Sequence, residues 1–194
     1  MGIRETAASP VVIRQAAPAD FAAISALTLA GFRDGPYGHI PPSVERIALV
    51  EDAAGRAAAG ELLVAEVDAV IVGTANLLRA GSPYGRLGRP GEAELRLLTV
   101  ASAARGRGIA EALVNASIES AAEWGVDQLV LDTGDQNFAA QRLYERMNFS
   151  RDPQREQELA ASSSDGIGSF VYTKVLRGVQ VVDDALVQQA VGGQ

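Results

Sequence analysis

Four consecutive residues in the middle of the chain, Arg105, Gly106, Arg107 and Gly108, have types that suit phosphate binding. Apolar residues recur at helical spacing over 109–124, so this turn opens onto the N-terminus of a helix. The first helical turn presents unpaired backbone N–H groups and the positive end of the helix dipole. Glycine lets an anion approach the backbone closely, and arginine adds positive charge. The turn therefore predicts a pyrophosphate site, against the alternative of a solvated basic turn whose glycines serve only chain geometry.

Two common nucleotide-binding patterns do not fit this turn. A dinucleotide fold needs G-x-G-x-x-G, but Glu111 stands three residues after Gly108. The phosphate loop G-x-x-x-x-G-K-[ST] is also missing. A Rossmann-type oxidoreductase is further disfavoured because alternating parallel strands do not precede the turn.

The segments around the turn position it. The 94–100 segment has the apolar and β-branched content of a buried strand, and 128–132 predicts the next strand. The 137–149 segment predicts a helix. Together these elements form a strand, turn, helix, strand, helix unit.

This unit resembles the GNAT family of N-acetyltransferases. Arg105, Gly108 and Ala110 occupy the three specified places of the family signature [Q/R]-x-x-G-x-[G/A]. The 137–149 segment resembles the family's N-x-x-A-x-x-L-Y-E-x-x-G-F helix. Asn148 stands where the family usually has glycine, and asparagine also tolerates the left-handed conformation that ends a helix.

The resemblance implies an α/β GNAT fold over 11–177, with an N-terminal tail over 1–10 and a C-terminal tail over 178–194. Its mixed central β-sheet has splayed central strands and helices on both faces. Acetyl-CoA is expected in the wedge between the splayed strands, where pantetheine amides can replace a missing strand neighbour. The expected cofactor-binding residues are Leu98, Thr99, Val100, Arg105, Gly106, Arg107, Gly108, Ile109, Ala110, Asn137 and Tyr144.

The same resemblance gives candidate roles to individual side chains. Glu94 is the candidate general base, directly or through water, and otherwise a strand-end carboxylate or a salt-bridge partner of Arg96. Tyr144 is the candidate acid toward the CoA sulfur, and otherwise a packing tyrosine. Asn137 is a candidate cofactor contact, a helix cap, or both. Tyr37 and His39 are candidate acceptor-binding residues, although plain surface-loop contacts are the alternative.

Local composition predicts the structure of the remaining segments. Glycine and proline predict loops over 31–42 and 79–92. After Phe149 comes a polar segment rich in serine and glutamine, to which no element is assigned. Strands are expected at 11–14, 62–67, 70–78 and 170–176, and helices from Pro18 and Ser43, the second with a break at Gly55, and within the C-terminal tail at 185–191.

Composition excludes several classes of site. The chain of 194 residues has no cysteine, so disulfides, thiolate metal sites and cysteine nucleophiles are excluded. A single histidine excludes a histidine-rich metal cluster, and no metal is expected. The net charge of −7 disfavours nucleic-acid or anionic-membrane binding as the main task. Without a signal-peptide pattern or a membrane span, a cytoplasmic location is expected.

The expected activity is therefore transfer of an acetyl group from acetyl-CoA to a primary amine. The alternative is a catalytically silent acyl-CoA-binding sensor or interaction module. The expected partners are acetyl-CoA and an amine acceptor on a small molecule or protein, and a homodimer stays open as an assembly. The acceptor itself depends on the two loops, whose conformations the sequence does not define.

Overall fold

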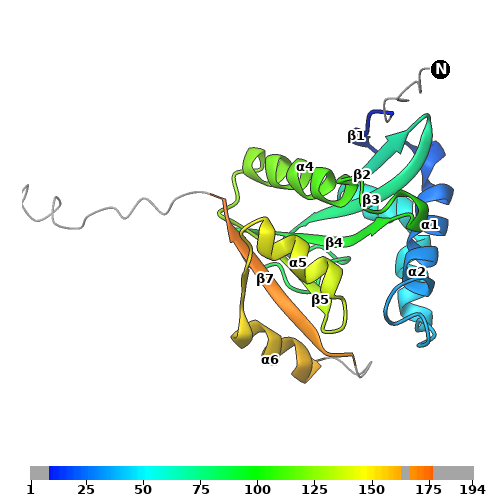
Figure 1. Ribbon diagram of the computed structural model, residues 1–194. Coiled ribbons are helices and arrows are strands. Elements are labelled where there is room, and N and C mark those ends of the chain that lie inside the picture. Colours follow the sequence, from blue (N-terminus) through cyan, green and yellow to red (C-terminus); the bar gives the residue numbers. More distant parts are fainter. Residues whose placement is uncertain (1–8, 163–166, 177–194) are drawn as a thin grey trace, which may run out of the picture.

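The alternating apolar residues of the chain build a seven-stranded sheet in the computed structural model, which describes residues 9–162 and 167–176 (Figure 1). The strand order is β1-β2-β3-β4-β5-β7-β6. All neighbours pair antiparallel except β4 and β5, which are parallel. The strands are β1 Val12–Gln15, β2 Gly60–Val67, β3 Val70–Arg79, β4 Glu92–Val100, β5 Gln128–Gly134, β6 Ser150–Arg151 and β7 Ser169–Val175.

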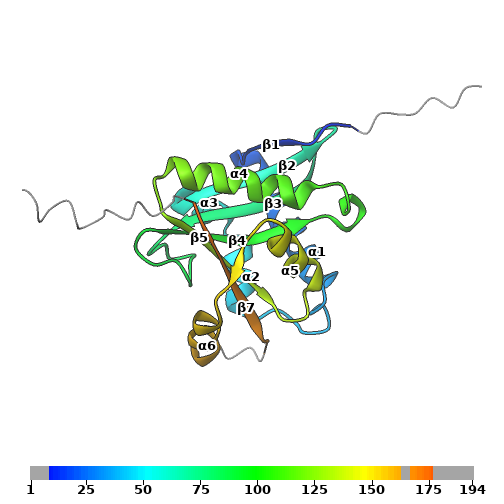
Figure 2. The same ribbon diagram turned by 60° about the vertical axis from the view of Figure 1, so that its left-hand side comes forward.

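Helices cover both faces of this sheet, as the GNAT resemblance implies (Figure 2). The helices are α1 Phe21–Arg33, α2 Val44–Glu51, α3 Ala53–Ala59, α4 Ile109–Glu123, α5 Phe138–Arg146 and α6 Pro153–Ser162, with 3-10 turns η1 Pro18–Asp20 and η2 Ser102–Ala104. Successive residues of β2 serve opposite faces, because side chains alternate along a strand. Leu63 belongs to the core cluster of Leu113 on α4, whereas Leu62 belongs to the cluster of Ile24 on α1. The two helical layers thus share one sheet.

A bulge interrupts β4 near its C-terminal end. Leu97 has a positive φ of 53°, and Leu97 and Leu98 together stand opposite Ala75 of β3. One extra residue shifts the alternation of side chains by one position. Leu98 and Val100 therefore pack against the core cluster that contains α4, as Leu95 does before the bulge.

The parallel ladder between β4 and β5 ends early. Its last pair is Leu95 and Leu131, although β4 continues to Val100 and β5 continues to Gly134. Over the same length β5 keeps its antiparallel pairing with β7. The two central strands therefore diverge into a wedge, which confirms the predicted splay.

Two local predictions need correction. Helix α1 continues through Gly31 to Arg33, because one glycine costs only about 1 kcal/mol in a helix of good formers. A Cβ on Gly31 would lie 2.4 Å from Cγ2 of Thr99, so the missing side chain also lets α1 approach β4 closely. The break near Gly55 is at Asp52 instead, where the Asp52 carboxylate accepts the N–H of Gly55 and begins a new helix.

The polar segment after Phe149 contains a helix that the sequence prediction missed. Pro153 is the first residue of α6, and Oδ1 of Asp152 accepts the N–H of Arg155 at 3.1 Å. Proline at the first position and an acidic cap before it are ordinary start signals for a helix. The left-handed end of α5 was predicted correctly, since Asn148 has a φ of 59°.

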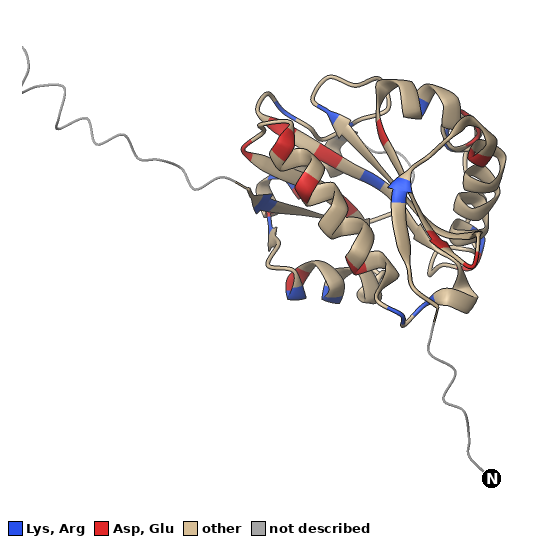
Figure 3. Cartoon of the chain, turned by 90° about the horizontal axis from the view of Figure 1, so that it is seen from above, with Lys and Arg blue, Asp and Glu red and all other residues tan. Residues whose placement is uncertain are grey.

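The expectations for the two tails fall mostly outside the described residues, including the helix expected at 185–191. Across the described ranges, no helix is both long enough and apolar enough to cross a membrane. Both signs of charge are spread over the helices and strands (Figure 3).

Candidate functional site

The glycine turn before α4 has the geometry of an anion cradle. Gly106 and Gly108 have φ values of 77° and 76°, a conformation that residues with a Cβ rarely adopt. The backbone N–H groups of Gly106, Arg107 and Gly108 donate no hydrogen bond to the described residues. The fifteen-residue helix α4 begins directly after them, so its dipole adds to the same site.

The side chains in and directly after the turn are either exposed to solvent or buried in the core. Arg105 and Arg107 are exposed. Arg105 donates to the carbonyl oxygen of Val100 at 3.4 Å, and Arg107 donates to that of Ser9 at 3.3 Å. Ile109 is only 2% exposed and belongs to the core. Its backbone N–H is therefore the part of Ile109 that can face an anion.

The free edge of β4 forms one wall of the wedge. The N–H of Ala101 donates to Val72 of β3 at 2.8 Å, so Ala101 points its polar backbone groups toward β3. Neighbouring residues of a strand point these groups in opposite directions, and Val100 therefore faces the wedge. Thr99 instead turns its backbone toward β3, and its side chain lies against α1 at Gly31.

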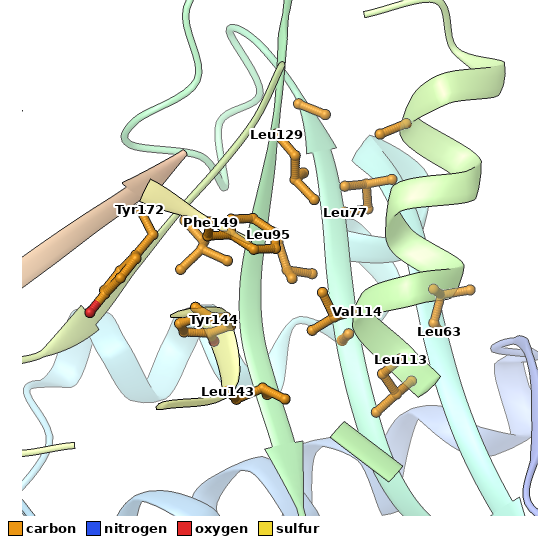
Figure 4. Close-up of a cluster of buried hydrophobic side chains, with 14 of the residues drawn as sticks. Leu63, Leu77, Leu95, Leu113, Val114, Leu129, Leu143, Tyr144, Phe149 and Tyr172 are labelled. Carbon is orange, nitrogen blue, oxygen red and sulfur yellow. The ribbon is translucent and has the colours of Figure 1, made fainter. Parts of the chain in front are cut away.

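Tyr144 of α5 lies at the wedge. Its ring is 5% exposed and lies 5.8 Å from the ring of Phe149 and 5.6 Å from that of Tyr172. Figure 4 shows Tyr144 between β4 and Tyr172. Burial raises the pKa of the Tyr144 hydroxyl well above its usual value, and the negative charge of Asp132 raises it further. This hydroxyl forms no hydrogen bond with the described residues, so its proton is free for a partner.

Asn137 caps the helix that carries Tyr144. Its side-chain oxygen accepts the N–H of Ala140 at 3.4 Å, as expected for a residue at the helix N-cap. The side chain of Gln141 secures the same turn by donating to the carbonyl oxygens of Gly134 and Asp135. The cap interpretation of Asn137 is therefore confirmed, and a cofactor contact stays a prediction.

Glu94 is almost completely buried, with 1% of its surface exposed. Its Oε2 accepts the backbone N–H groups of Arg86, Leu87 and Gly88 at 2.8, 2.8 and 3.0 Å. Its Oε1 has no hydrogen-bond partner and lies 3.5 Å from Nε of Arg96, which confirms the salt-bridge alternative. Glu94 thus anchors the 80–91 loop with one oxygen and keeps the other unoccupied by hydrogen bonds.

Further polar contacts hold the same loop. Nη1 of Arg96 donates to the carbonyl oxygen of Tyr84, and the Tyr84 hydroxyl donates to Asp52. Burial lowers the pKa of Arg96, and the charge of Glu94 opposes that effect. The loop between β3 and β4 is thereby fixed as a wall beside the wedge.

Asp132 of β5 is a charged residue at the wedge that the sequence analysis did not select. Its two carboxylate oxygens accept from Nε and Nη2 of Arg86, with an Nε–Oδ1 distance of 3.2 Å. The side chain of Asp132 is 12% exposed, and that of Arg86 is 31% exposed. A carboxylate directly after the apolar run of 129–131 was the available signal.

Tyr37 and His39, the two candidate acceptor contacts, have different surroundings. The Tyr37 hydroxyl donates to Oδ1 of Asp135 at 2.5 Å and accepts the N–H of Gln136 at 2.6 Å. Burial and the bond to Asp135 raise the pKa of Tyr37. Tyr37 thus ties the loop after α1 to the end of β5, whereas His39 is exposed and forms no hydrogen bond with the described residues.

Comparison with known proteins gives one family and a set of partial relatives. The family model described as the acetyltransferase (GNAT) family matches residues 28–149. The chain is 39% identical over 92 residues to a mouse protein named probable N-acetyltransferase family 8 member 5, and 36% identical over 90 residues to human N-acetyltransferase 8B. These matches cover 47% and 45% of this chain but only 39% and 37% of the relatives.

Solved structures share the fold over most of the chain. A GNAT acetyltransferase from Staphylococcus aureus superimposes with a TM-score of 0.69 at 18% identity, covering 87% of this chain and all of that one. A putative acetyltransferase from Salmonella typhimurium, solved with its cofactor acetyl-CoA, has a TM-score of 0.61 at 21% identity over 88% of this chain and 96% of that one. At such identities the likeness concerns the fold.

Proposed function

The chain belongs to the GNAT family of acetyltransferases, and we propose that it moves the acetyl group of acetyl-CoA to a primary amine by direct attack. One observation carries this proposal. The open edge of β4 runs along a wedge that leads to the glycine turn with its free N–H groups. An extended chain with amides followed by a diphosphate matches both parts of that surface.

Acetyl-CoA binding would use mainly the backbone. The N–H and C=O groups of Leu98 and Val100 would pair with the pantetheine amides, because no strand occupies that side of β4 in the described residues. The N–H groups of 106–110 would hold the pyrophosphate, with Arg105 and Arg107 adding charge. Asn137 stays a proposed contact beside Tyr144.

The reaction removes two protons from the acceptor nitrogen and supplies one to the leaving sulfur, so one proton is released overall. The ammonium group loses the first proton, the amine nitrogen bonds to the thioester carbon and loses the second proton, the C–S bond breaks, and the departing thiolate gains a proton. We assign proton removal to Oε1 of Glu94 through a water molecule, because this oxygen accepts no hydrogen bond from the described residues and has only the 3.5 Å ion pair with Arg96. Direct contact with a bulky acceptor is disfavoured by the burial of the Glu94 side chain.

Tyr144 is the proposed donor of the proton that the leaving sulfur gains. Its raised pKa keeps the phenol protonated at every pH at which amines react. Its hydroxyl is not committed to a hydrogen bond with the described residues, and its ring is held by Phe149 and Tyr172. Tyr37 and His39 stay proposed acceptor contacts at the rim, with Tyr37 acting through the position of its loop.

A thiol-release assay tests this function directly. The chain has no cysteine, so a thiol reagent sees only the CoA that is released. Acetyl-CoA should raise the melting temperature, and CoA release should depend on an added amine. Thermal stabilisation without release from any amine would identify an acyl-CoA sensor instead. If acetyl-CoA causes neither thermal stabilisation nor CoA release, the acetyl-CoA assignment is rejected.

A further inference from the structure

The position of Asp132 follows from the register of the parallel strands. Glu94 of β4 pairs with Val130 of β5, so their side chains share one face of the sheet. Asp132 lies two residues beyond Val130 and therefore projects from that same face. The ladder has ended at Leu131, and Asp132 is consequently the first β5 residue on this face inside the wedge.

Asp132 is more accessible than Glu94. The side chain of Asp132 is 12% exposed, against 1% for that of Glu94. Glu94 uses one oxygen for three backbone N–H groups, whereas both oxygens of Asp132 bind the guanidinium group of one side chain, Arg86, which is 31% exposed. A side-chain partner can be exchanged more easily than three amides of an anchored loop.

Asp132 also lies near the reacting end of the wedge. Asp132 pairs with Val171 of β7, next to Tyr172, whose ring lies 5.6 Å from that of Tyr144. Tyr144 is the proposed acid toward the leaving sulfur, and the charge of Asp132 helps to raise the pKa of its hydroxyl. An amine that attacks the thioester must reach the carbon beside that sulfur. Asp132 therefore stands where a carboxylate can hold an incoming ammonium group.

We propose that Asp132 binds the ammonium group of the acceptor and that Arg86 binds a carboxylate of the same acceptor. The acceptor is then a small zwitterion of the amino-acid class, and this inference rests on the proposed acetyl transfer. An ammonium group that takes Asp132 removes two hydrogen bonds from Arg86. An acceptor with a carboxylate beside its amine restores them, because a carboxylate can accept from the guanidinium group as Asp132 does.

The substrate test compares acceptors that differ only in their anionic group. CoA release is measured with L-leucine, L-leucinamide and 3-methylbutylamine, and with the same three forms of several other amino acids. The acids should react with kcat/KM values about ten- to a hundredfold above those of their amides, the range expected for a lost charged hydrogen bond. Equal values for acids and amides would overturn this inference and leave acetyl transfer in place. Absence of release with every amine would instead reject the proposed function.

Substitutions in the pair separate binding from a structural role. Arg86→Gln should remove the preference for acids over amides, and Asp132→Asn should raise KM for all amines while the acetyl-CoA melting shift stays. Arg89→Gln is the matched control, because Arg89 lies in the same loop and pairs with Glu158 at 2.5 Å outside the wedge. It should keep the wild-type preference. A folded Arg86→Gln variant with an unchanged preference, or an Asp132→Asn variant with unchanged KM, would refute the assignment.

Discussion

Leu95 of β4 and Leu131 of β5 form the last pair of the only parallel ladder in the described sheet. Beyond this pair, β4 keeps its contact with β3 but has no strand on its other side. The glycine turn, Tyr144 and Asp132 all lie at the opening that results. The end of one ladder thus leaves the backbone edge of β4 open, and this is the surface that we propose for an extended cofactor and its acceptor.

Gly108→Asp should abolish the rise in melting temperature caused by acetyl-CoA. The substitution places a negative charge among N–H groups that would hold the diphosphate, and it puts a side chain where φ is 76°. Gly81→Asp is a matched control, since Gly81 has a φ of 79° and equally open surroundings but lies far along the chain in another loop. Loss of the shift in both variants, or in neither, would contradict the pyrophosphate assignment.

Glu94→Gln should lower turnover most at low pH and keep acetyl-CoA affinity. A protonated amine cannot attack, so the lost base is partly compensated as the pH approaches the pKa of the amine. Weaker hydrogen bonds to the 86–88 amides should also reduce the free energy of unfolding by about 1–3 kcal/mol. Rates over a pH range and urea denaturation measure the two effects.

Glu92→Gln is the control for the loop-anchoring part of that result. Glu92 lies on the same strand, and its Oε2 accepts from the N–H of Arg89 at 2.9 Å and from Arg155 at 2.7 Å. It should lose stability without a pH-dependent loss of turnover. An equal loss of rate at every pH in Glu94→Gln would make Glu94 a positioning residue only.

Stability should fall as the pH rises above about 10, the ordinary pKa of tyrosine. The pKa values of all four tyrosines are raised, by burial for Tyr37, Tyr144 and Tyr172 and by the bond to Asp52 for Tyr84. The folded chain then keeps protons that the unfolded chain releases, so stability is complete below pH 10 and is lost through the folded pKa values. Urea unfolding between pH 8 and 11 measures this loss, which should be smaller in Tyr172→Phe. A free energy of unfolding that stays constant between pH 8 and 11 would contradict this prediction.

The sequence predicted elements whose signals are local. Asn148 was placed correctly in the left-handed conformation, because few residue types adopt it. The end of α1 was misplaced, since the packing of Gly31 against Thr99 joins residues far apart in the chain. The splay of β4 and β5 came from the family resemblance and not from periodicity, which does not report pairing partners.

The charged part of the site was less predictable for the same reason. Glu94 was selected by its place on the central strand, but its three amide partners lie in a loop whose conformation the sequence does not define. Asp132 was passed over because one acidic residue after an apolar strand has many ordinary roles. The role that we propose for it rests on the end of the ladder and on the contact with Arg86, two tertiary features that the sequence does not define.

Tyr144→Phe separates chemistry from binding most cleanly. Only a hydroxyl without a partner in the described residues is lost, so the fold and the acetyl-CoA melting shift should stay. A thiol has a pKa near 8.5 and can leave as a thiolate with little help, and turnover should therefore fall by about ten- to a thousandfold rather than vanish. The loss should shrink with an acyl donor whose leaving thiol is more acidic.

Tyr172→Phe, which removes a hydroxyl bonded to Glu145 at 3.4 Å, is the control and should keep turnover. Wild-type turnover in Tyr144→Phe would leave Tyr144 with packing alone, and joint loss of binding and turnover would make it a cofactor-binding residue.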